Sequence, residues 1–198
     1  VNIEACALVD CFARVFRRAA DAQRTVMFID LGEHSTQVVL AQGTRVCFAR
    51  NLFIAGRQLD QAVAEGLGLP LEQAHALRRD LARGSDDEIA ENELFRVLSD
   101  PLDAMTAELT QCLRYHASVF RNQPVERAIF VGGGAHDKRL CQTIAQRLNM
   151  PAQVGDPLLR VGRVDGAGLD IGLDRREPQP RWAVAVGLSF GAEPGKAA

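Results

Sequence analysis

Residues 25–40 read TVMFIDLGEHSTQVVL and decide the fold. An apolar run ends at Asp30, a glycine and two hydroxyl residues follow, and a second apolar run leaves. The pattern predicts a strand that brings a carboxylate to a tight turn, and a second strand that returns antiparallel to the first. Exposed backbone N–H groups in such a turn make a concave site for anions. The stretch is therefore either a cradle for phosphate and a metal ion, or a β-turn that needs glycine and whose Asp30 accepts backbone hydrogen bonds.

The chemistry of the cradle follows from its residue types. Asp30, at the strand end, is suited to hold Mg²⁺ through a water molecule, because magnesium keeps most of its waters and takes few carboxylates. Gly32 lets the backbone approach an anion without a Cβ in the way. The N–H groups around residues 33–36 and the hydroxyls of Ser35 and Thr36 are neutral donors that suit phosphate oxygens.

Composition narrows the class of protein. The chain has 198 residues, of which 47% are apolar and 24% charged, which is typical of one soluble globular domain. The net charge of −2 gives no electrostatic footprint for nucleic acid. No apolar run approaches the roughly 20 residues of a membrane-spanning helix, so we expect no insertion into a membrane. The five cysteines lack C-x-x-C spacing and favour reduced thiols in a cytosolic protein over disulfides or a zinc site.

Apolar periodicity predicts the remaining elements. Strands with short glycine-containing connections form a three-stranded antiparallel meander at residues 25–30, 35–41 and 45–51. Two later strands are predicted at 127–131 and 152–154. Helices are predicted at 3–19, 58–67, 71–82, 87–121, 137–149 and 181–190. Pro101 either interrupts the fourth of these helices or opens its second half, with Asp100 as N-cap. Residues 155–180 are predicted to be irregular.

The order is β-β-β-α, a helical insertion, and then β-α-β-α. A Rossmann fold would begin with parallel β-α-β units, so this order predicts a ribonuclease-H-like α/β half-domain instead. Because the helical pattern begins at Ile3, we expect the chain to be part of a longer protein.

A second candidate motif is the run Gly132, Gly133 and Gly134. It lies between a predicted buried strand and a helix N-terminus, where N–H groups and the helix dipole favour an anion. It is not a P-loop, because no lysine–serine pair follows, and Asp137 stands where G-x-G-x-x-G requires its last glycine. Asp137 is suited to be the helix N-cap.

Together the two motifs resemble a known superfamily. FIDLGEHSTQVVL (28–40) followed about a hundred residues later by IFVGGGAHDKRL (129–140) is similar to the actin-like ATPases. Within them the chain most resembles the PilM family of type IV pilus assembly proteins, in the stretches LFIAGRQLDQAVAEGLGLPLEQAHALR (52–78), LRYHASVF (113–120) and AVAVGLSF (183–190). The resemblance implies the second lobe of an actin-like fold (23–198), with a helical insertion at about 68–123. Residues 1–22 would be the crossover helix from a first lobe outside this chain.

The resemblance also implies a ligand and a site. ATP with Mg²⁺ would bind between two lobes, its phosphates against Gly32, Ser35 and Thr36 and its metal near Asp30. The three glycines would lie under the ribose and adenine. The helix 71–82 would contact adenine, with Glu72 or His75 as its acid and Arg78 as its base, although Arg78 is also interpretable as a solvated helix arginine.

The implied partner is the short cytoplasmic tail of an inner-membrane pilus assembly protein, bound mainly by the first lobe. The protein would be cytoplasmic and peripheral to the inner membrane through its partners, and self-association stays open. We expect no ATP hydrolysis from this chain alone, and we assign it no catalytic residue.

Two alternatives remain at this stage. One is a nucleotide-free scaffold of the same fold, since Glu33 would repel a triphosphate and His75 stands where an acid is expected. The other is an actin-like small-molecule kinase, whose catalytic residues would lie in the first lobe.

Overall fold

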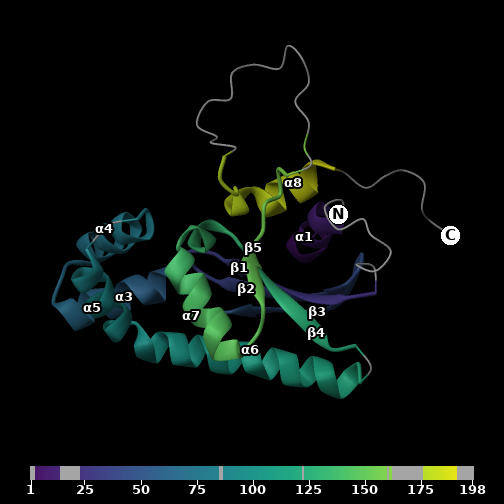
Figure 1. Ribbon diagram of the computed structural model, residues 1–198, viewed down its shortest axis with the longest axis horizontal. Coiled ribbons are helices and arrows are strands. Elements are labelled where there is room, and N and C mark those ends of the chain that lie inside the picture. The colour runs from purple at the N-terminus through teal and green to yellow at the C-terminus, as the bar shows by residue number, and fades with distance from the viewer. Residues whose placement is uncertain are drawn as a thin grey trace, which may run out of the picture.

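A five-stranded mixed sheet forms the centre of the molecule (Figure 1). The computed structural model describes residues 3–13, 23–84, 87–121, 123–159, 161 and 176–190. The strand order is β3-β2-β1-β4-β5. This order, with the first three strands antiparallel and the last two parallel to β1, confirms the predicted ribonuclease-H-like α/β arrangement.

The strands lie close to their predicted positions. The antiparallel meander consists of β1 (Thr25–Leu31), β2 (Thr36–Gln42) and β3 (Arg45–Leu52). The parallel strands are β4 (Val125–Val131), which pairs with β1, and β5 (Ala152–Val154), which pairs with β4. Because β1 is central, its two faces are both buried, which explains why it reads as a continuous apolar run.

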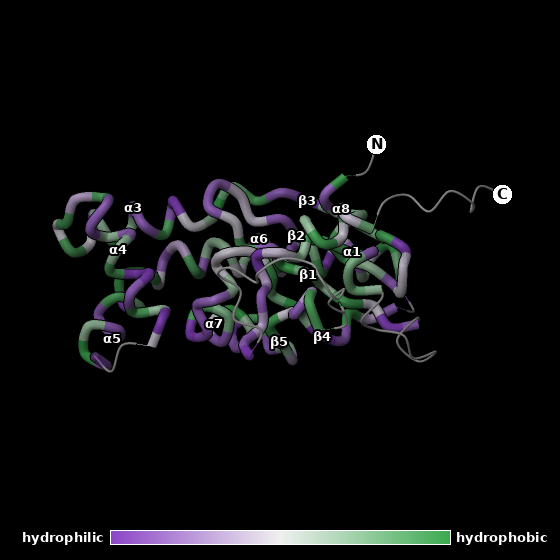
Figure 2. The backbone as a smooth tube through the Cα atoms, turned by 90° about the horizontal axis from the view of Figure 1, so that it is seen from above, coloured by the Kyte–Doolittle hydropathy of each residue, from purple (hydrophilic) through white to green (hydrophobic). Residues whose placement is uncertain are grey.

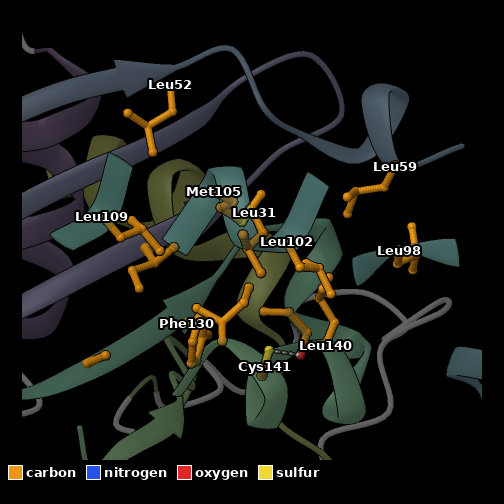
Figure 3. Packing of buried hydrophobic residues seen from close by; sticks show 14 of the residues in the cluster. Leu31, Leu52, Leu59, Leu98, Leu102, Met105, Leu109, Phe130, Leu140 and Cys141 are labelled. Carbon is orange, nitrogen blue, oxygen red and sulfur yellow. Dashed lines mark hydrogen bonds between the residues drawn. The ribbon is translucent and has the colours of Figure 1, made fainter. Parts of the chain in front are cut away.

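One face of the sheet is covered by α6 (Ser99–Val119) and α7 (Lys138–Leu148). Alternate residues of β1, Met27 and Ile29, point to this side and join the larger hydrophobic core. Figure 3 shows Leu102, Met105 and Leu109 of α6 packed in this core with Phe130 of β4 and Leu140 of α7. The long helix thus packs on the sheet at the side away from α1 and α8.

The opposite face is covered by α1 (Glu4–Ala13), on which α8 (Ala183–Ser189) packs (Figure 1). A Cβ at Gly187 would collide with the carbonyl oxygen of Ala7, so the two backbones lie in contact. Val26 and Phe28 of β1 form the smaller core with this layer, and the Phe12 and Phe28 rings lie 5.3 Å apart. The predicted helix at 3–19 is confirmed over Glu4–Ala13, and its last part lies outside the described residues.

A group of three helices projects beyond the end of the sheet (Figure 1). It comprises α3 (Gly56–Leu67), α4 (Leu71–Ala82) and α5 (Glu88–Val97). These helices alternate between hydrophilic and hydrophobic stretches at one end of the molecule, as Figure 2 shows. The insertion predicted at about 68–123 contains α4, α5 and also α6, which packs on β2 and β3.

The break between α5 and α6 falls at Leu98, and the prediction of Asp100 as N-cap is wrong. Leu98 occupies the cap position, and both Asp100 and Pro101 lie in the first turn of α6. The missing N–H of a proline costs no helical hydrogen bond in the first turn, and an acid there interacts favourably with the helix dipole. Pro101 therefore does open the second half of the helical stretch.

Two short 3₁₀ turns complete the described fold, η1 (Gly133–His136) and η2 (Pro180–Trp182). All five cysteines are free thiols, and Cys11, Cys112 and Cys141 are buried. Within the described part of the chain, no helix has both the length and the apolar character to cross a membrane.

Candidate functional site

The turn between β1 and β2 is a hairpin closed by Gly32, whose N–H donates to the carbonyl of Ser35 at 3.2 Å. A Cβ at Gly32 would lie 2.6 Å from the same oxygen, so the turn requires glycine here. In the described part of the chain, no hydrogen bond uses the N–H groups of Glu33, His34 and Ser35. The hairpin therefore presents three backbone donors near the end of β1, as a site for an anion would.

The start of α3 holds this turn in place. The N–H groups of Gly56 and Arg57 donate to the carbonyls of Gly32 and Glu33, at 3.0 and 2.8 Å. A Cβ at Gly56 would lie 3.3 Å from both the Glu33 Cα and the Gly32 oxygen, a contact closer than most side chains tolerate. The first amides of α3 are thus used to fix the hairpin rather than to bind an anion directly.

Asp30 provides a half-buried carboxylate beside the turn. Burial, and after it the negative charge of Glu4, together raise the pKa of Asp30 to about 6. No hydrogen bond to its side chain occurs among the described residues. The negative charge of the ionised carboxylate is therefore not balanced by a neighbouring positive charge or hydrogen-bond donor among the described residues, and a bound cation would stabilise it. The alternative in which Asp30 accepts backbone hydrogen bonds of the turn receives no support from these contacts.

The glycine run lies directly against this carboxylate. The parallel register pairs Asp30 with Val131, so that Gly132 follows at the same edge of the sheet. Gly132 has φ 84°, and a Cβ there would collide with Oδ1 of Asp30 and lie 2.7 Å from the Leu31 carbonyl. Gly133 has open space around it. The two motifs, a hundred residues apart in sequence, form one continuous backbone surface.

The two predicted hydroxyls differ in their environment. Thr36 is fully buried, and its Oγ1 donates to the carbonyl of Ile54 at 2.7 Å, so this hydroxyl connects β2 to the segment before α3. Ser35 is half-buried at the end of the turn. In this conformation Ser35 is the hydroxyl of the pair that can reach a ligand.

Arg78 lies inside the helical group rather than in solvent. Its Nη1 donates to Oδ1 of Asp60 at 2.5 Å and to the Gly56 carbonyl at 3.0 Å. The second oxygen of Asp60 lies 2.8 Å from Nδ1 of His75. The interpretation of Arg78 as a solvated helix arginine is therefore wrong, because only 12% of its side chain is exposed.

A cavity of about 490 Å³ opens between α4, α5 and the start of α7, next to the glycine run. Asp137 caps α7 and accepts from the N–H of Leu140 at 2.8 Å, as predicted. Burial raises the pKa of Asp137, against the effect of its backbone hydrogen bonds and of the Arg78 charge. At the rim, Arg139 pairs with Glu91 at 2.7 Å. The cavity is lined mainly by polar and charged side chains, has the volume of a small-molecule pocket, and begins at Asp137, three residues after the glycine run.

Sequence reasoning missed two residues of this region. Asp60 lies on the same helix face as Leu59 and Val63, so a carboxylate on the apolar stripe of α3 was the available signal. Glu4, whose charge acts on Asp30, carried no such signal, because only the packing of α1 on the sheet brings it near. In the part of the chain that the structure describes, no group of three acidic, histidine or cysteine side chains could hold a metal ion by itself.

Comparison with protein families matches residues 1–192 to the family described as type IV pilus assembly protein PilM. The chain belongs to this family. The match covers nearly all of the sequence, including the hairpin, the glycine run and both outer helices.

Solved structures support the same fold. The chain is similar to a structure of the PilM–PilN type IV pilus biogenesis complex, with a TM-score of 0.72, 22% identity, and coverage of 92% of this chain and 50% of that one. It is also similar to the ethanolamine utilization protein EutJ from Carboxydothermus hydrogenoformans (TM-score 0.62, 14% identity, 93% and 53% covered). A third similar structure is MreB5 of Spiroplasma citri bound to AMPPNP (0.62, 12%, 93% and 57%). The chain spans about half the length of these proteins, and the likeness establishes an actin-like fold.

Proposed function

We propose that this chain is the second lobe of a PilM-type pilus assembly protein and supplies half of a site for ATP and Mg²⁺. The observation that supports the proposal is the environment of the Asp30 carboxylate. Its carboxylate lies against Gly132, beside three free N–H groups of the hairpin, and burial raises its pKa to about 6. A carboxylate that is costly to ionise and forms no ion pair with any described residue suits a site whose cation arrives with the ligand.

Each part of the surface then has a role. Asp30 would hold the hydration shell of Mg²⁺, because the described residues contain no group of three ligands that could bind the ion directly. The N–H groups of the turn, with Gly32 and the Ser35 hydroxyl, would donate to phosphate oxygens. Gly132, Gly133 and Gly134 would lie under the ribose, and the cavity beside Asp137 would take the base. Direct contact of Arg78 with the nucleotide is not part of this proposal, since its guanidinium is bound to Asp60 and Gly56.

The partner follows from the family. The matched PilM structure is a complex with PilN. We propose the cytoplasmic tail of an inner-membrane pilus assembly protein as the partner of the whole protein, bound mainly through the first lobe. The protein would then work in the cytoplasm, peripheral to the inner membrane.

Calorimetric titration of the full-length protein with ATP tests the nucleotide site. We expect Asp30→Ala to weaken binding by about tenfold or more when Mg²⁺ is present, since a charge-assisted contact contributes about 1.5–3 kcal/mol. Without Mg²⁺ the variant should bind no more weakly than the wild type. Asp103→Ala removes an exposed carboxylate on α6 and is the matched control. Equal affinities of Asp30→Ala and wild type with Mg²⁺ would contradict the proposed role of Asp30.

One alternative keeps a supporting observation. Glu33 is exposed on the hairpin turn, where its charge would repel a triphosphate, so a nucleotide-free scaffold is the second candidate. That function predicts neither heat nor a thermal shift on addition of ATP and Mg²⁺. The family match is to pilus assembly proteins, so it does not support the alternative of an actin-like small-molecule kinase.

Hydrolysis is expected to need residues outside this chain. We predict no steady-state ATP hydrolysis by residues 1–198 alone, and turnover that Asp30→Ala abolishes would contradict this.

A further inference from the structure

Asp60 is a buried carboxylate that the proposed site does not use directly. Only 6% of the residue is exposed, although it lies on the face of α3 that also carries Leu59 and Val63. Burying a carboxylate is costly unless it is paired and hydrogen-bonded, and an apolar side chain would fill the same space at lower cost. Stability of the fold therefore does not explain why a carboxylate occupies position 60.

The contacts of Asp60 form a chain that ends at the hairpin. Asp60 holds Arg78, and Arg78 donates to the carbonyl of Gly56 at 3.0 Å. The N–H of Gly56 donates in turn to the carbonyl of Gly32 at 3.0 Å. Each of these links joins charged or backbone groups in a buried or half-buried position, so each one restrains the next.

The charge of Arg78 also acts on the other side of the site. This charge lowers the pKa of Asp137, against the dominant effect of burial, so the guanidinium acts on the residue that caps α7 after the glycine run. Arg78, on α4, thus contacts α3 and lies close enough to the start of α7 for its charge to act on Asp137. A displacement of Arg78 would therefore affect both the hairpin that faces the phosphates and Asp137, which lies beside the proposed base pocket.

We propose that Asp60 is a positioning residue, which holds Arg78 against the Gly56 carbonyl and thereby fixes the hairpin turn in the conformation that receives the nucleotide phosphates. This inference rests on the proposed nucleotide site for its functional half. Its structural half, the fixing of the turn, is independent of any ligand. Asp60 and Arg78 act through the backbone of Gly56 and touch no ligand themselves.

The chain offers a matched control for Arg78. Arg147, on α7, likewise donates to a backbone carbonyl, that of Ser99 at 3.2 Å, and pairs with a carboxylate, that of Asp103 at 2.7 Å. Arg147→Met removes the same kinds of contact as Arg78→Met, at a place that has no connection to the hairpin among the described residues. Loss of stability alone would therefore affect both variants.

The first measurement is amide hydrogen exchange in the ligand-free, full-length protein. We expect the N–H groups of Gly56 and Arg57 to exchange about tenfold faster in Asp60→Asn and in Arg78→Met, since a charged hydrogen bond of about 1.5 kcal/mol is lost. Arg147→Met should leave them unchanged. In the double variant the two effects should not add, because Asp60 acts through Arg78. Unchanged exchange at Gly56 and Arg57, or additive effects, would overturn the proposal.

The second measurement is the affinity for ATP with Mg²⁺ in the same variants. We expect about tenfold weaker binding in Asp60→Asn and Arg78→Met, and wild-type binding in Arg147→Met. If the Gly56 and Arg57 amides exchange faster in these variants but the affinity for ATP with Mg²⁺ is unchanged, the proposed effect of Asp60 on nucleotide binding is wrong. If the wild-type protein binds no nucleotide, the proposed function fails, and amide exchange alone then decides whether Asp60 positions the turn.

Discussion

Replacing Asp30 with asparagine should stabilise the protein when no metal is present. Burial and the charge of Glu4 raise the pKa of Asp30 from 3.8 to about 6, so the folded protein binds this proton more tightly than the unfolded chain does. Below about pH 4 both states hold the proton, and above about pH 6 both have lost it. Between these values the folded protein holds more of this proton than the unfolded chain does, so the free energy of unfolding falls as the pH rises.

The magnitude follows from the size of the shift. Two pKa units correspond to about 3 kcal/mol at pH 7, which solvent screening of a half-buried group reduces to about 1–2 kcal/mol. For a protein of this length, that is a rise in Tm of about 4 °C for Asp30→Asn. Glu4→Gln should give a smaller change of the same sign, because the charge of Glu4 is the second cause of the shift.

Urea unfolding in EDTA, measured from pH 4 to pH 8 on wild type and Asp30→Asn, checks this. The two proteins should be equally stable near pH 4. Above pH 6 the free energy of unfolding of Asp30→Asn should be higher than that of the wild type by the full difference of about 1–2 kcal/mol. Asp103→Asn, at an exposed carboxylate, should follow the wild type at every pH. If Asp30→Asn is instead less stable at pH 7, Asp30 accepts hydrogen bonds from the turn, and the argument for a cation beside it fails.

Three further predictions concern other positions. Gly132→Ala should lower the free energy of unfolding by about 2 kcal/mol or more, because φ is 84° and the new methyl group would collide with Asp30. Gly133→Ala, which has open space around it, should change the free energy of unfolding by no more than about 0.5 kcal/mol. Equal urea midpoints for the two variants would contradict this prediction. Gly187→Ala should cost about 1–3 kcal/mol by overpacking against Ala7, and an unchanged Tm would show that the two helices can separate at no cost. Burial lowers the pKa of His116 from 6.5, so the wild type should lose stability relative to His116→Leu as the pH falls through 6.5; parallel stability curves of the two proteins between pH 8 and pH 5 would refute the assignment.

The fold was largely predictable because its elements carry strong local patterns. The three meander strands are β-branched and apolar runs with glycine connections, and the structure places them within one or two residues of the predicted ends. The misassigned cap at Asp100 shows the limit. An acid before a proline is a sound local signal for a helix start, but the packing of Leu98, which is fully buried, set the break two residues earlier.

The candidate site was predictable in part. The juxtaposition of Asp30 with Gly132 follows from parallel pairing of two strands whose carboxyl ends meet at one edge, and sequence order suggested it. The roles of Thr36 and Arg78 could not be predicted in this way. Whether a hydroxyl or a guanidinium faces a ligand or another part of the chain depends on side-chain contacts with distant residues, here Ile54 and Asp60, which no local pattern encodes.

The contact between α1 and α8 has a consequence for how the chain acquires its structure. These helices come from opposite ends of the sequence, so among the contacts between described elements theirs closes the longest loop and has the largest entropic cost. During synthesis α1 can cover Val26 and Phe28 early, but α8 cannot reach Ala7 until all the residues between the two helices have emerged. While these residues are being synthesised, the sheet face would be only half covered, and this layer is where we expect chaperone binding or misassembly to begin.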